Sequence, residues 1–187
     1  MNPKSVYQEL SKYINNNCAF NIVLVIFGAR PACWYDCWDL TPAKMQKLLN
    51  YLDLFKKHQI HYKFDNNVDI FNEVEYEGPL IYNKRVLSKY LIEKIENKDL
   101  SVLYHQKIFG RILGYNCQVD IYKRKNHAEV DIYLQTSTKK LQVYGFYCKK
   151  TNIQKIKKTL SIKIDKMNNI AQQINKKYTV SATIKIN

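Results

Sequence analysis

The chain has 187 residues, of which 46% are hydrophobic and 25% are charged, and its formal net charge is +14. This composition is typical of globular proteins and excludes disordered, collagen-like and low-complexity classes. The longest purely apolar run, residues 22–27, is far shorter than the roughly 20 residues that cross a bilayer, so we expect no transmembrane segment.

Five cysteines occur at irregular spacing, and no secretory signal is recognisable before them. An odd number of cysteines in such a chain predicts reduced thiols and an intracellular location, cytoplasmic or nuclear. Cys18, Cys117 and Cys148 lie in or beside apolar segments, so we expect them to be small core residues.

The first 64 residues contain both helical and extended patterns. Thr41 followed by Pro42 predicts a helix start, because the hydroxyl caps the first turn and proline suits the first helical position. The apolar run at 20–27 is rich in β-branched residues, which predicts a strand buried on both faces. The predicted elements are a helix at 3–15, the strand at 20–27, a loop at 28–40, a helix at 41–57 and a strand at 60–64. A strand followed by a helix and a second strand predicts a parallel, right-handed crossover.

An acidic, polar stretch at 65–79 ends in Gly78-Pro79 and predicts a boundary between two lobes. Helices are predicted after it, near 84–96 and 99–113, from apolar residues three and four apart. The expected division is a small α/β lobe at 1–78 and a helical and β-meander lobe at 79–187.

The last third of the chain alternates apolar and polar residues with a period of two. Short polar turns join the predicted strands at 118–124, 128–135 and 140–148, so we expect an antiparallel meander. An amphipathic helix at 153–177 and a closing strand at 179–186 follow. The fold class predicted is α+β: the small α/β N-terminal lobe plus an antiparallel β-meander covered by helices, in the order helix–β–β–β–helix–β.

Positive charge is concentrated near the C-terminus, where residues 137–187 hold 12 lysines and one acid, Asp165. Such a surface attracts polyanions and is typical of proteins that bind phosphate backbones. A solvated helix in a lysine-biased chain would show the same excess. The candidate nucleic-acid-binding residues are Lys149, Lys150, Lys155, Lys158, Lys166 and Lys176.

Carboxylates fall on one face of the predicted meander. Alternation places Asp120 on the first strand and Glu129 and Asp131 on the second, and acids that converge in this way are able to hold a divalent metal for phosphodiester hydrolysis. The element order resembles the core of the PD-(D/E)xK nuclease family, and Asp131 matches the acid of that family's second strand. The third strand reads Gln142-Val143-Tyr144 and lacks the family's acid-x-Lys.

Aromatic residues share that face. Tyr122, Tyr133, Tyr144 and Phe146 suit a platform on which unpaired bases stack, or else a packing surface beneath other elements.

A ligand loop is predicted at 28–40, because it follows a predicted strand and precedes a helix N-terminus, where anions bind. Its candidate residues are Arg30, Trp34 and Asp36. The alternative is a structural loop in which Arg30 pairs with an acid of the same loop.

Cysteine and histidine pairs flank the helix predicted at 41–57: Cys33 with Cys37, and His58 with His61. A helix of that length separates its ends by roughly 25 Å, too far for four ligands of one zinc ion. We therefore expect no metal site and no cofactor.

These patterns predict a non-catalytic binding or assembly protein whose lysine-rich C-terminal surface engages nucleic acid or an acidic protein surface. One alternative is a metal-dependent nuclease that uses Asp120, Glu129 and Asp131. The other is a structural subunit of a viral or other large particle.

Overall fold

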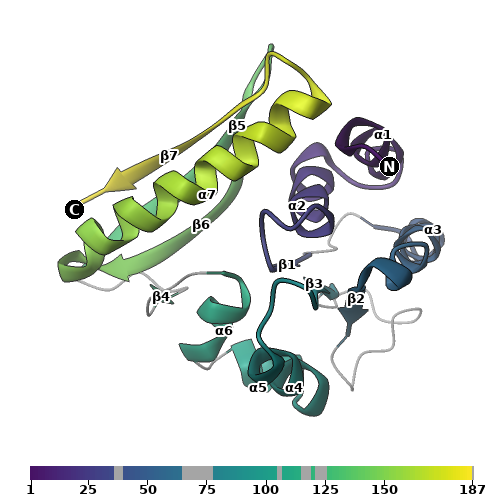
Figure 1. Ribbon diagram of the computed structural model, residues 1–187, viewed down its shortest axis with the longest axis horizontal. Helices are drawn as coiled ribbons and strands as arrows, with labels where there is room; N and C mark the ends of the chain where they lie inside the picture. The colour runs from purple at the N-terminus through teal and green to yellow at the C-terminus, as the bar shows by residue number, and fades with distance from the viewer. Residues whose placement is uncertain (36–39, 65–77, 105–106, 115–118, 121–125, 187) are drawn as a thin grey trace.

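The computed structural model describes residues 1–35, 40–64, 78–104, 107–114, 119–120 and 126–186. Two antiparallel sheets and helices around them form an α+β fold, which confirms the predicted class (Figure 1). The first half contains α1 (Pro3–Leu10), α2 (Asn16–Ile26), β1 (Ala32–Trp34), α3 (Pro42–Asp53), the 3-10 turn η1 (Lys56–His58), β2 (Ile60–Lys63) and β3 (Leu80–Asn83). The second half contains α4 (Lys89–Asn97), α5 (Leu100–Tyr104), α6 (Lys107–Ile112), β4 (Val119–Asp120), β5 (His127–Gln135), β6 (Lys140–Lys149), η2 (Lys150–Asn152), α7 (Ile153–Ile174) and β7 (Thr179–Lys185).

The C-terminal sheet has the strand order β4-β6-β5-β7. The hairpin of β5 and β6 and the closing strand β7 agree with the alternating pattern, and α7 lies along this sheet (Figure 1). The expected simple meander is wrong in one respect, because β4 pairs with β6 and not with its sequence neighbour β5. In this order the ten-residue strand β6 lies between β4 and β5, and β7 forms one edge of the sheet.

A β-bulge changes which residues of β6 face the core. The register shifts between Ile132 and Tyr133, so Gln142 and Tyr144 pair with consecutive residues of β5 and Val143 is the extra residue. Beyond the bulge, Phe146 pairs with Val130 and is only 5% exposed. The expectation that Phe146 lies on the polar face is therefore wrong, since a bulge breaks the period of two.

Residues 20–27 are helical rather than extended. Asn15 caps α2 by accepting a 3.0 Å hydrogen bond from the Cys18 backbone N–H. The helix packs among α1, β1, β3 and β6, and it is buried around most of its circumference. A helix buried on all sides needs no polar stripe, so its sequence looks like that of a buried strand.

The N-terminal sheet has the order β1-β3-β2, and both pairs are antiparallel. The predicted parallel crossover is therefore wrong. The central strand of this sheet, β3, follows residue 78 in sequence, yet it pairs with two strands that precede this residue. The division at 78 stays a prediction about folding units, but this sheet spans it.

Successive residues of β3 face two different cores. Leu80 and Tyr82 pack with Leu91, Ile95 and other residues of α4–α6. Ile81 points to the opposite core, which continues through α1, α2 and α3 to the C-terminal sheet and α7. Burial on both faces explains why this short segment is entirely apolar until Asn83.

Candidate functional site

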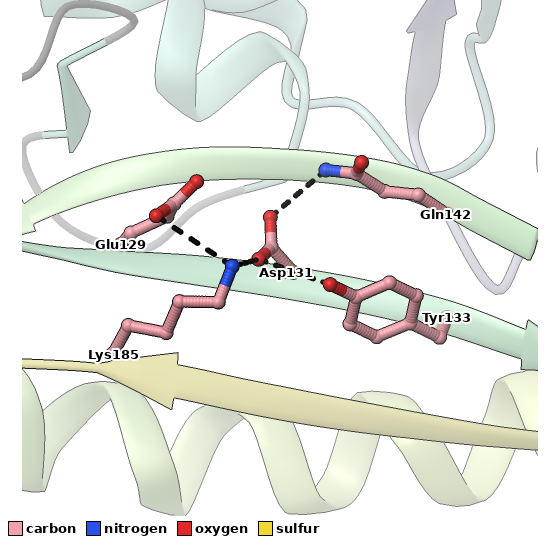
Figure 2. Close-up of polar contacts among 5 residues, drawn as sticks. All are labelled: Glu129, Asp131, Tyr133, Gln142 and Lys185. Carbon is pink, nitrogen blue, oxygen red and sulfur yellow. Dashed lines mark hydrogen bonds and ion pairs between the residues drawn. The ribbon is translucent and has the colours of Figure 1, made fainter.

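The predicted acidic face carries a buried carboxylate that is fully engaged (Figure 2). Asp131 is 2% exposed and accepts hydrogen bonds from Gln142 Nε2 at 2.8 Å, Lys185 Nζ at 2.9 Å and Tyr133 Oη at 3.2 Å. Lys185 also lies 3.7 Å from a Glu129 oxygen. The hydrogen bond to Asp131 raises the pKa of Lys185, so this side chain stays charged at neutral pH.

This arrangement fixes the edge strand β7 to β5 rather than presenting open metal ligands. Lys185 Nζ contacts both carboxylates, which is the place that a cation would need to occupy. Asp120 lies in β4, where it pairs with Tyr147 of β6. Among the residues that the structure describes, three or more metal-ligating side chains do not cluster anywhere.

The predicted aromatic platform is only partly described. Phe146 faces the core, and Tyr122 lies outside the described residues. Tyr144 pairs with Ile132, and Lys140 Nζ lies 3.9 Å from the centroid of the Tyr133 ring. Of the predicted platform, Tyr133 is therefore the one described side chain on the polar face, and Lys140 covers its ring.

The predicted ligand loop contributes to packing between layers. Arg30 is 5% exposed and donates to Asn21 Oδ1, and Asn21 Nδ2 donates to the Val143 carbonyl at 2.7 Å. Trp34 lies in β1, edge-to-face with Phe109 at 5.1 Å between ring centroids. Asp36 lies outside the described residues, as does Cys37. Ligand binding here stays a prediction, and a ligand would compete with Asn21 for the guanidinium.

The six candidate lysines are distributed along α7 and beyond both its ends. Lys149 ends β6, Lys150 begins η2, and Lys176 lies in the turn after the helix. Lys155, Lys158 and Lys166 are exposed on α7 itself. A helix of 22 residues is roughly 33 Å long, so one small ligand does not reach all six.

A groove between α7 and the N-terminus of α4 collects part of this charge. We call it the α4–α7 groove, and its volume is about 610 Å³. It is lined by Gly28, Ala29, Pro31, Val86, Leu87, Ser88, Leu91, Arg111, Gly114, Lys158, Thr159, Ile162, Lys163 and Lys166. Ligand pockets commonly occupy about 300–1,000 Å³, so this groove is large enough for one.

The charge of the groove is one-sided. Lys158, Lys163, Lys166 and Arg111 line it, and the described lining contains no carboxylate. Of these, Lys158 and Lys166 are exposed, and the described part of the chain offers neither of them an ion pair. Cations that converge without acids raise the local concentration of anions.

Asn83 holds one wall of the groove in place. This 3%-exposed side chain donates to the Val25 carbonyl at 2.9 Å and accepts from the Arg85 backbone N–H at 3.0 Å. The backbone N–H groups of Val86 and Leu87 both donate to the Asn83 carbonyl. The turn that carries Val86 is thereby fixed to the end of α2.

Two glycines allow the backbone segments of the groove to approach each other. Gly28 and Gly114 have positive φ angles of +74° and +89°, which disfavour residues with a Cβ. A Cβ on Gly114 would lie 2.7 Å from Pro31 Cδ, so the end of α6 lies directly against that proline.

Sequence reasoning found Lys158 and Lys166 but missed Lys163 and Arg111. Lys163 precedes Lys166 by three residues, a spacing that places both on adjoining positions of one helix face. Arg111 comes from α6, and nothing in the sequence brings that helix to α7. Helical spacing could thus have identified Lys163 from the sequence, whereas only the tertiary structure shows that Arg111 lies at the groove.

Comparison with known proteins finds no matching family model, no similar curated protein and no similar solved structure. Within the described residues, none of the helices is long and apolar enough to cross a membrane.

Proposed function

We propose that the protein is a non-catalytic binding protein that engages an anionic macromolecule, nucleic acid or acidic protein, through the α4–α7 groove. The observation that carries this proposal is the set of four cationic side chains around one hollow whose described lining contains no carboxylate. Lys155 lies one turn before Lys158 and extends the same positive surface along α7.

The metal-dependent nuclease is the weaker alternative. Its acid Asp131 is buried and bonded to Lys185, Gln142 and Tyr133, an arrangement that stabilises the sheet without any ligand. A cleavage assay with Mg²⁺ or Mn²⁺ separates the two functions, since the binding proposal expects no turnover from the wild type or from Asp131→Ala.

A binding assay with two labelled probes tests the proposal: a 20-nucleotide single strand and a poly-glutamate peptide. We expect at least one probe to bind, with an affinity that falls steeply as salt rises. Four contacts to a single strand correspond to a slope of about −3 in log K against log salt. Lys158→Glu with Lys166→Glu should weaken binding by more than about tenfold, and the loss of two contacts should reduce the magnitude of the slope for the single strand by about 1.4.

Lys44→Glu with Lys47→Glu is the matched control. Both lysines are exposed on α3, which lies apart from α7, and the substitutions change the net charge by the same amount (Figure 1). If both double variants weaken binding equally, net charge rather than the groove determines affinity and the proposal is wrong. Failure of both probes to bind the wild type at low salt would also refute it.

A further inference from the structure

The apolar part of the α4–α7 groove distinguishes between anionic partners. Its described lining includes Val86, Leu87, Leu91 and Ile162, whereas the described residues contribute no aromatic side chain to it. Val86 is 45% exposed and Ile162 is 59% exposed, so two aliphatic side chains face solvent between the cations.

Exposed aliphatic side chains do not suit nucleic acid. Proteins that bind single strands stack the bases on aromatic rings, and duplex is contacted mainly through its phosphates. Neither form would bury Val86 and Ile162 as fully as the aliphatic side chains of a polypeptide would. A partner that does so must carry aliphatic groups as well as negative charge.

An acidic polypeptide segment has both features. Leucine, isoleucine or valine side chains would bury the exposed aliphatic residues, and aspartate or glutamate side chains would meet the lysines and Arg111. This is the usual pattern of an amphipathic segment in a groove, with apolar anchors and charged flanks that fix its orientation.

We infer that the α4–α7 groove binds an acidic, aliphatic segment of a partner protein. The inference rests on the proposed function and narrows its class of partner. Charge complementarity selects an anion, and the exposed aliphatic side chains of Val86 and Ile162 select a polypeptide. Val86 and Ile162 are the specificity residues, and Lys158, Lys166 and Arg111 supply the attraction.

Three fluorescent probes of equal negative charge test the inference by anisotropy. The first is a peptide of glutamate and leucine with leucines three and four residues apart, and the second replaces its leucines by serine. The third is oligothymidylate. We expect the leucine peptide to bind at least tenfold more tightly than the serine peptide, and more tightly than the oligonucleotide at equal salt.

Ile162→Ser removes apolar surface without changing charge. Because this side chain is 59% exposed, the variant should fold, and circular dichroism checks this. It should weaken the leucine peptide at least fivefold and leave oligothymidylate binding within twofold. Val86→Ser, at the opposite wall, should give the same pattern and serves as the second variant.

The outcomes separate this inference from the proposed function. If oligothymidylate binds best, or if both serine variants leave the leucine peptide unaffected, the polypeptide partner is wrong while groove-mediated anion binding stands. If no probe responds to Lys158→Glu with Lys166→Glu, the proposed function fails together with the inference.

Discussion

Replacing Gly114 by alanine measures how tightly the end of α6 packs against Pro31 beside the groove. Gly114 has φ +89°, and a left-handed conformation costs a residue with a Cβ about 1–2 kcal/mol. The new Cβ would also lie 2.7 Å from Pro31 Cδ and 2.8 Å from Pro31 Cγ. Such overpacking typically costs about 1–3 kcal/mol, so with the backbone cost Gly114→Ala should lower the free energy of unfolding by roughly 2–5 kcal/mol.

Gly28→Ala is the matched control, because Gly28 has a similar φ of +74°. Its added Cβ would meet Val86 Cγ2 at 3.5 Å, an ordinary van der Waals contact, so only the same backbone cost of about 1–2 kcal/mol applies. Urea denaturation followed by circular dichroism gives both free energies. If Gly114→Ala costs no more than Gly28→Ala, the close approach to Pro31 is not a real constraint and the reasoning is refuted.

Three further predictions concern buried or half-buried polar groups away from the groove lysines. Asp131→Ala removes the buried carboxylate that accepts a hydrogen bond from Lys185, and it should lower the free energy of unfolding in urea by about 2–3 kcal/mol. Glu129→Ala should lower it by less than about 1 kcal/mol, so equal costs would contradict the structure. Asn83→Ala removes a buried donor and acceptor and should cost about 1–3 kcal/mol in the same assay, and a neutral effect would show that the turn is not held there. Burial, with nearby lysines, lowers the pKa of His61, so the unfolded chain binds a proton at this imidazole more readily than the folded protein does. The free energy of unfolding should therefore decline as pH falls below about 6.5. His61→Phe should flatten this decline, and a pH profile identical to that of the wild type would show that His61 is not its cause.

The parts of the fold that were predicted correctly are those in which local patterns and tertiary contacts agree. Thr41 caps α3 through its hydroxyl, as the Thr-Pro pair indicates. The stripe of α7 and the alternation of β5, β6 and β7 appear in the sequence because each element has one buried and one exposed face. The α+β class follows from these elements alone.

The errors arise where burial is complete or where pairing is distant. Residues 20–27 lack a polar face, so helix and strand cannot be distinguished by periodicity. Leu80–Asn83 was missed as a strand because its partners β1 and β2 lie far away in sequence. The bulge at Val143 reverses the facing of Phe146, and no local signal marks it.

The candidate site was predictable in its charge but not in its shape. Lysine enrichment near the C-terminus identified Lys158 and Lys166. The groove itself needs Gly28, Val86 and Arg111, which come from three other segments, and their meeting depends on the packing of the whole chain.

Nuclear magnetic resonance mapping of the peptide-binding site shows whether the α4–α7 groove binds the anion. Isotopically labelled protein is titrated with the glutamate–leucine peptide, and backbone amide shifts are followed. We expect the largest shift changes at the groove, at Ser88, Gly114 and Ile162, with Lys44 and Lys47 unchanged. Changes concentrated elsewhere, or spread evenly over all exposed lysines, would contradict binding at the groove.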